Sequence, residues 1–153
     1  MKRYNVIYLL NPTGDQLLMC RRKKEPYRGL LNLVGGKIKD SEDHLAAAYR
    51  ELAEETGIAG QDVALTHLMD FTYYHPDCLL EVYAGQLRRD IPVHGDENEL
   101  LWVSADENFF DTSRFAGDGN IGHIQIIAQY RRENGVCSEN SPGSLREGAP
   151  PQR

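Results

Sequence analysis

The chain has 153 residues, the length of one ordinary domain with a single hydrophobic core. Its hydrophobic share of 41% and charged share of 26% are typical of a soluble globular protein, and its apolar runs are too short to cross a bilayer, which excludes a membrane-spanning role. The net charge of −6 disfavours a surface that holds a polymer by counterion release, so we expect no polymeric nucleic acid as a partner.

The first part of the chain predicts a β-hairpin. Residues 5–10 and 16–22 are short apolar-rich runs, and the turn-forming residues 11–15 separate them. Residues 30–34 are a further candidate strand, after which Gly35-Gly36 interrupts the pattern.

Residues 41–56 predict an amphipathic helix. Ser41 is expected to cap its first turn, with Glu42 and Asp43 favourably placed beside the helix N-terminus. Gly57 stands where a left-handed C-terminal cap is expected. The residues that recur at helical spacing and are expected to face the core are Leu45, Ala48, Tyr49 and Leu52.

The second half of the chain predicts further strands at residues 63–74, 79–87 and 100–103, with a turn at 75–77 between the first two. A helix is expected at residues 121–133, ended by Asn134-Gly135. Residues 136–153 are polar and offer little to bury, so we interpret them as a flexible tail after one domain at 1–135. Strands on both sides of a helix indicate an α/β or α+β layered fold.

The start of the chain and its cysteines indicate a cytoplasmic protein. The polar residues Asn5, Asn11 and Asp15 interrupt the apolar stretch that a secretion signal would need. The cysteines are odd in number and widely spaced, which fits neither a disulfide framework nor a zinc site, so we expect free thiols in a reducing compartment. They are Cys20, Cys78 and Cys137.

The charge is polarised along the chain. Residues 1–40 contain nine Lys and Arg against three Asp and Glu, and the remainder contains eight against twenty. A small phosphorylated ligand that bridges a basic and an acidic patch fits this distribution. The composition leaves open whether the protein is a monomer or a homodimer.

Three glutamates of the predicted helix share one face. Glu51, Glu54 and Glu55 lie at i, i+3 and i+4, where like charges destabilise a helix by about 0.2 to 0.5 kcal/mol per pair. A divalent cation would offset this repulsion, because Mg²⁺ and Mn²⁺ prefer carboxylate oxygens and leave positions for phosphate and water. A solvated acidic face is the alternative for such a stripe taken alone.

The residues around the stripe favour the metal-binding interpretation. The segment 36–58 fits the pattern Gx5Ex7REUxEExGU, where U is aliphatic, at every fixed position. The chain therefore resembles the Nudix hydrolases, and in particular the small MutT-like purine nucleoside triphosphate pyrophosphohydrolases. The matching positions are Gly36, Glu42, Arg50, Glu51, Leu52, Glu54, Glu55, Gly57 and Ile58.

The resemblance implies an α/β/α sandwich around a mixed sheet and a Mg²⁺-dependent hydrolase, with Mn²⁺ as a substitute. It assigns Glu51, Glu54 and Glu55 as metal ligands, with the Gly35 carbonyl as a further one. It also implies that Glu42 pairs with Arg50 to hold the helix geometry.

The family's general base varies, being either a box glutamate, here Glu51, or an acidic residue on a loop before a later strand. That loop here is 96–99, with sequence DENE. Glu97 lies five residues before Trp102, the spacing at which relatives that hydrolyse oxidised purine nucleotides carry an extra metal-binding glutamate. We therefore prefer Glu97 to Asp96 and Glu99, while a solvated acidic loop is the alternative.

The basic side chains Arg21, Lys23 and Lys37 are candidates for binding the phosphates. Strand alternation places Arg21 and Lys23 on the face opposite Arg22, and one of these faces is expected to be solvated.

Recognition of the base is predicted from amides, a carboxylate and aromatic rings. Asn32 matches the asparagine that hydrogen-bonds the base in purine nucleoside triphosphate hydrolases. Asp118 and Asn120 are second candidates, with a loop and a helix cap as their alternative. The aromatic residues considered for stacking on the base, or else for the core, are Phe109, Phe110 and Phe115.

We predict hydrolysis of a purine nucleoside triphosphate, with 8-oxo-purines as candidates, to the monophosphate and pyrophosphate. One alternative is cleavage of dinucleoside polyphosphates or nucleotide sugars, because Tyr74 lies near where diadenosine polyphosphate hydrolases carry a tyrosine. The other is a non-catalytic domain that senses or binds nucleotides.

Overall fold

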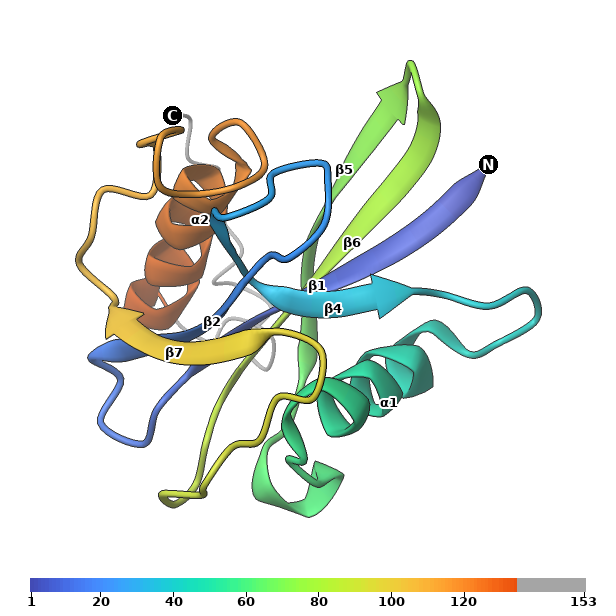
Figure 1. Cartoon of the computed structure of the whole chain (residues 1–153). Helices are drawn as coiled ribbons and strands as arrows, with labels where there is room; N and C mark the ends of the chain where they lie inside the picture. The colour runs from blue at the N-terminus through green and yellow to red at the C-terminus, as the bar shows by residue number, and fades with distance from the viewer. Residues whose placement is uncertain (135–153) are drawn as a thin grey trace.

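The computed structural model describes residues 1–134 as a mixed β-sheet with one helix on each side (Figure 1). The α/β/α prediction is confirmed. In chain order the elements are β1 (Lys2–Leu10), β2 (Gln16–Arg21), β3 (Leu31–Asn32), β4 (Val34–Lys37), α1 (His44–Thr56), a short 3-10 helix η1 (Gly60–Asp62), β5 (Thr66–Tyr74), β6 (Asp77–Gln86), β7 (Glu99–Ser104) and α2 (Asn120–Asn134).

The sheet has the central order β3-β2-β1-β6-β5, with β4 also pairing with β1 and β7 with β2. The β1–β6 pair is parallel, and the other pairs are antiparallel. The predicted hairpin of β1 and β2 is present, but its register pairs only Leu10 with Leu17 beside the turn. Beyond that point the two strands separate, and each pairs with other strands.

Two apolar clusters lie on the two faces of the sheet, because side chains alternate along each strand. In β2, Leu17 and Met19 face α2, whereas Leu18 and Cys20 face α1. The α1 cluster includes Ile7, Leu9, Ala48, Leu52, Ile58 and Tyr83. The α2 cluster includes Phe109, Phe115, Ile121, Ile124 and Ala128.

The start of α1 differs from the prediction. Asp43, and not Ser41, caps the helix, and its carboxylate accepts a hydrogen bond from Ala46 N–H at 2.9 Å. Glu42 instead folds back, and its side chain accepts a hydrogen bond from Lys39 N–H at 3.0 Å. The prediction that Leu45 faces the core is also wrong, since this side chain is 43% exposed.

The predicted strand at residues 30–34 is two strands. Asn32 Oδ1 accepts a hydrogen bond from Leu33 N–H at 2.8 Å, and the chain moves there from the edge of β2 to β1. The sequence predicted that Gly35-Gly36 interrupts the strand pattern, but both glycines belong to β4. Glycine is required because a Cβ atom on Gly35 would overlap the Asn5 backbone.

The other boundaries shift by a few residues. The predicted strand at 63–74 begins at Thr66, because η1 and the buried side chains of Val63 and Leu65 precede it.

Within residues 1–134, neither helix has the length and apolar content needed to cross a membrane. Cys20 and Cys78 are free thiols. Cys137 and the predicted tail at 136–153 lie outside the described residues.

The packing of α1 predicts a large stability difference between two leucines of the same helix. Leu52 is fully buried, so Leu52→Ala should lower the free energy of unfolding by about 2 to 5 kcal/mol. Leu45→Ala, the matched control, should change it by less than about 0.5 kcal/mol. Urea denaturation followed by circular dichroism measures both, and equal losses would contradict the packing described.

Candidate active site

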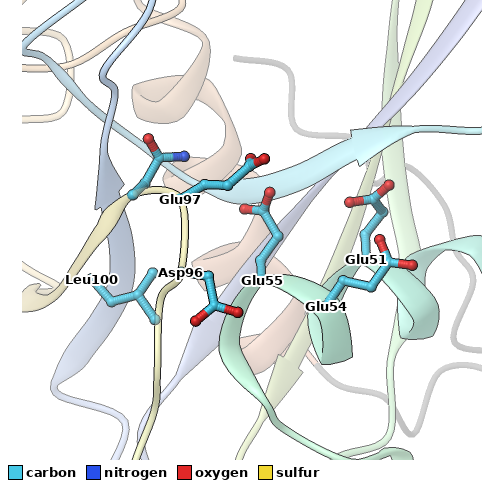
Figure 2. Close-up of a pocket in the computed structure, with 7 residues that line it drawn as sticks. Glu51, Glu54, Glu55, Asp96, Glu97 and Leu100 are labelled. Carbon is cyan, nitrogen blue, oxygen red and sulfur yellow. The ribbon is translucent and has the colours of Figure 1, made fainter.

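The last two turns of α1 carry the glutamates predicted as metal ligands. The helix ends at Gly57, whose φ of 81° is the left-handed conformation that glycine adopts without a Cβ clash. Leu52, on the opposite side, is buried against the sheet. The buried face fixes the rotation of α1, so Glu51, Glu54 and Glu55 are directed away from the core (Figure 2).

Arg50 is the centre of an ion-pair network in this segment. Its Nε atom lies 2.6 Å from Glu42 Oε2 and its Nη2 atom donates to Glu42 Oε1 at 3.0 Å, as the resemblance implied. Its Nη1 atom donates to Glu51 at 3.0 Å and to Glu54 at 3.2 Å. The Lys37 carbonyl accepts a further hydrogen bond at 3.1 Å. Arg50 therefore ties the end of β4 and the loop before α1 to the glutamate face.

Glu51 packs directly on the backbone of Gly36. A Cβ atom added to Gly36 would overlap the Glu51 carboxyl group. The side chain of Glu51 is only 12% exposed, whereas that of Glu54 is 59% exposed. The glycine that opens the motif is thus required by the glutamate fifteen residues later.

The glutamates form one wall of a cavity of about 440 Å³. The loop before β7 forms the opposite wall, and the side chains of Glu55 and Glu97 point toward the same space (Figure 2). The cavity lining consists of Glu51, Glu54, Glu55, Asp96, Glu97, Asn98 and Leu100. Of these, Asn98 and Leu100 were not predicted as site residues.

The electrostatics of the cavity follow from its crowded carboxylates. The pKa of Glu55 is raised to about 7, mainly by burial and further by the charges of Glu51 and Glu97, while a backbone hydrogen bond from Gly35 opposes the rise. Burial also raises the pKa of Glu51, although the hydrogen bond from Arg50 opposes this shift. Glu42, hydrogen-bonded to Arg50, has its pKa lowered to about 2.

The donor chemistry of this cavity fits a hard divalent cation, because its lining offers carboxylate and amide oxygens. Within residues 1–134, however, no three His, Cys, Asp or Glu side chains converge into a ready-made ligand set. Glu51 and Glu54 are instead turned toward Arg50. Holding a cation would require these two side chains to exchange contacts with Arg50 for contacts with the metal.

Arg22, and not Arg21 as we had expected, is the arginine whose charge acts on the carboxylates of the cavity. Arg21 forms an ion pair with Glu99 at 3.2 Å, its register partner on β7, and bonds the Gly29 carbonyl. The charge of Arg22 lowers the pKa of Glu55. Because Leu18 and Cys20 face α1, strand alternation was the signal that could have identified Arg22.

The residues predicted to recognise the base gather around the loop 22–30. Asp118 accepts a hydrogen bond from Tyr27 OH at 2.6 Å, and Asn120 donates one to Tyr73 OH at 2.6 Å. The charge of Arg22 lowers the pKa of Tyr27 as well as that of Glu55. Tyr27 and Tyr73 were not predicted as site residues.

Asn32 lies on the strand beside this group, since Leu31 pairs with Phe115 and thereby brings the loop toward Asp118 alongside β3. Lys23 and Lys37 are exposed, and the contact of Lys37 with the site is through its carbonyl. Phe109 and Phe115 are core residues, 1% exposed, with ring centroids 4.8 Å apart. Neither can stack on a ligand.

A search with protein-family models matches the NUDIX domain to residues 1–129. The chain belongs to the Nudix family, as the motif at 36–58 predicted.

A relative from Mycobacterium tuberculosis, named "Putative 8-oxo-dGTP diphosphatase 2", is 33% identical over 96 residues, which are 61% of this chain and 68% of the relative. Family membership and this relative support the prediction of a pyrophosphohydrolase.

Solved structures with this fold include a MutT/nudix family protein from Enterococcus faecalis, with a TM-score of 0.56 and 26% identity over 66% of this chain. The match spans only 42% of that protein. An Ap4A hydrolase from C. elegans has a TM-score of 0.67 at 15% identity, with 83% of this chain and 96% of that one covered. At this low identity the second likeness concerns the fold alone.

Gly36→Ala should impair the site without unfolding the protein. The new methyl group must displace the Glu51 carboxyl group, so kcat for nucleotide hydrolysis should fall about 10- to 100-fold. Gly60→Ala is the matched control, because its Cβ would lie 3.3 Å from the Tyr49 ring, far from the cavity. Steady-state kinetics that showed equal rates for the two variants would refute the role assigned to Gly36.

Glu55 should make the metal-free protein less stable as the pH rises. Its pKa is about 7 in the folded state, above the ordinary value of 4.5, so its favourable contribution is complete below pH 4.5 and is lost as the pH rises through 7. At pH 8, Glu55→Gln should raise the free energy of unfolding by about 1 to 2 kcal/mol, a range reduced for solvent screening of this partly exposed group.

Urea denaturation with a chelator present, at pH 4.5 and pH 8, measures this effect. Glu133→Gln, at an exposed position of α2, is the control and should leave the pH dependence unchanged. Identical pH dependence in wild type and Glu55→Gln would show that the carboxyl group is not destabilised by burial.

Proposed function

We propose that the protein hydrolyses a purine nucleoside triphosphate, with guanine and 8-oxo-guanine bases preferred, to the nucleoside monophosphate and pyrophosphate. The observation that carries the proposal is the acidic cavity between α1 and the loop before β7, where the charge of Arg22 acts on Glu55. Acidic oxygens suit a metal-bound diphosphate, and an adjacent guanidinium suits a phosphate group.

Mg²⁺ is the proposed metal, with Mn²⁺ as a substitute, and Glu51, Glu54, Glu55 and Glu97 would hold it, with the Gly35 carbonyl as a further donor. When bound, the metal supplies neutralisation of the diphosphate charge and lowers the pKa of a water molecule. Arg50 would keep the glutamate face in place through Glu42. Arg22 would bind a phosphate oxygen and hold the chain of phosphates in line.

Glu97 is the general base that we propose. Glu51 is packed on Gly36 and ion-paired with Arg50, so its oxygens already serve the local structure. Glu97 extends from a loop toward Glu55 and the cavity (Figure 2). In the proposed step one water is consumed: one of its protons passes to a Glu97 carboxylate oxygen, its oxygen, with the other proton, bonds to phosphorus, and the bridging P–O bond breaks with its electron pair staying on the oxygen of the departing phosphate product.

The hydrogen-bonding groups beside Arg22 favour guanine over adenine. One oxygen of Asp118 accepts from Tyr27 OH, and Asn120 donates an amide hydrogen to Tyr73 OH. Asp118 and Asn120 therefore each keep an oxygen that can accept a hydrogen bond from a ligand. Guanine presents N–H donors at N1 and N2, and an 8-oxo-purine adds one at N7. Asn32, whose oxygen is bonded to Leu33 N–H, retains its amide hydrogens for the O6 acceptor. The M. tuberculosis relative carries the name of an enzyme for such a substrate.

A nucleotide panel tests the proposal. The purified chain with Mg²⁺ should show its highest kcat/KM with 8-oxo-dGTP and guanine triphosphates, releasing pyrophosphate rather than orthophosphate. Glu54→Gln should lower kcat by about 100-fold or more, whereas Glu133→Gln should leave it unchanged. Full activity of Glu54→Gln would refute the assignment of the carboxylates.

The same panel separates the alternative functions. Higher kcat/KM for diadenosine polyphosphates or nucleotide sugars would replace the triphosphate assignment, and the fold shared with the C. elegans Ap4A hydrolase makes this arm necessary. Tight nucleotide binding without any product would instead indicate a sensing domain. Tyr74, which suggested the diadenosine class, is 78% exposed and lies at the end of β5.

A further inference from the structure

A row of polar groups crosses the sheet beneath the first half of α1, on the face that is otherwise apolar. Three neighbouring strands contribute one residue each: Gly36 on β4, Asn5 on β1 and Glu81 on β6. Asn5 is in register with both of the others. We call these three residues the polar row.

Glu81 is a buried carboxylate with two short hydrogen bonds. It is 3% exposed, and Tyr83 OH donates to its Oε1 atom at 2.7 Å. His44 Nδ1 lies 2.6 Å from its Oε2 atom, and the imidazole carries the donated hydrogen there, because a carboxylate only accepts. Burial and the hydrogen bond to Glu81 both raise the pKa of Tyr83, so this phenol remains a donor.

These contacts fix the start of α1. His44 is the first residue of the helix, and its backbone belongs to the turn that Asp43 caps. Tyr83 is fully buried in the α1 cluster and stacks on His67, with ring centroids 4.8 Å apart. Glu81 therefore connects the helix start to a rigid part of the sheet.

Asn5 holds the other end of the same segment. Its Oδ1 atom accepts a hydrogen bond from Gly36 N–H at 3.0 Å, and the residue is 1% exposed. Its Nδ2 atom has no hydrogen-bond partner within residues 1–134. A buried amide without a partner is unfavourable, and an apolar side chain at this position would avoid that cost. What asparagine provides in return is the hydrogen bond to Gly36.

The segment between these two anchors controls the glutamate face. Gly36, at one end, forms the surface on which the Glu51 carboxyl group packs. Glu42, inside the segment, forms the shortest ion pair of Arg50, which in turn holds Glu51 and Glu54. A shift of either anchor would therefore move Glu51 relative to the wall formed by Glu97.

We propose that Asn5 and Glu81 are positioning residues, which clamp the segment from Gly36 to His44 onto β1 and β6 and thereby set the metal-binding geometry of α1. This inference rests on the proposed function for its catalytic consequence. Its structural part, the clamping of the segment, does not depend on the substrate.

Hydrogen exchange followed by mass spectrometry tests the clamping in the full chain without nucleotide. Glu81→Gln and Asn5→Leu should accelerate exchange of amides 36–47 and leave that of β5 and α2 near the wild-type rate. Asp62→Asn is the matched control. Asp62 lies on η1, away from this segment, and is a buried carboxylate paired with Arg89. Unchanged exchange at 36–47 would overturn the inference whatever the activity.

Kinetics and metal titration test the functional part. Both variants should lower kcat by about 10- to 100-fold, with little change in KM for nucleotide. The Mg²⁺ concentration that gives half of the maximal rise in Tm should increase by a similar factor. Asp62→Asn should change neither quantity. If Asp62→Asn lowered kcat as much as these two variants do, the polar row would affect activity only through general packing, and the inference would be overturned.

A milder variant covers the case in which a core substitution prevents folding. His44 has a 40% exposed side chain, so His44→Ala removes one anchor contact without opening the core, and it should show the same local change in exchange. If wild type hydrolyses no nucleotide while the exchange result holds, the proposed function fails and the clamp stands.

Discussion

The guanidinium of Arg50 is the interaction on which the site depends, because it allows three acidic side chains to occupy one small region before a ligand arrives. Glu42, Glu51 and Glu54 all bond to it. Without this cation, like charges on adjacent turns would oppose the helix. Glu55 lies beyond this network, beside Glu97, and burial together with the charges of Glu51 and Glu97 raises its pKa.

On the face of the sheet beneath α1, different residues stabilise the helix and position its glutamates. Its apolar part, where Leu52 packs, stabilises the helix through burial. Its polar row contributes less to stability, since a buried carboxylate and an unsatisfied amide are unfavourable in themselves. Position and stability are thus provided by different residues on the same face of the sheet.

The sequence predicts well whatever depends on local periodicity, and poorly whatever depends on which strands meet. The α1 helix and its Gly57 cap follow from local spacing, and the Glu42–Arg50 pair follows from the resemblance of a 23-residue segment to the family motif. The ion pair that Arg21 forms with Glu99 was not predicted, because it joins residues 78 positions apart. Tyr27, Tyr73 and Glu81 were not predicted, because no short-range pattern connects them to the groups that they bond.

The separation of β1 from β2 beyond Leu10 and Leu17 has a mechanical meaning for the cavity. The glutamate face stands on the part of the sheet built around β1, whereas Arg22 and the loop of Glu97 belong to the part built around β2 and β7. The two walls of the cavity therefore stand on different parts of the sheet, and their contacts with each other depend on how β1 and β2 are joined beside Leu10 and Leu17.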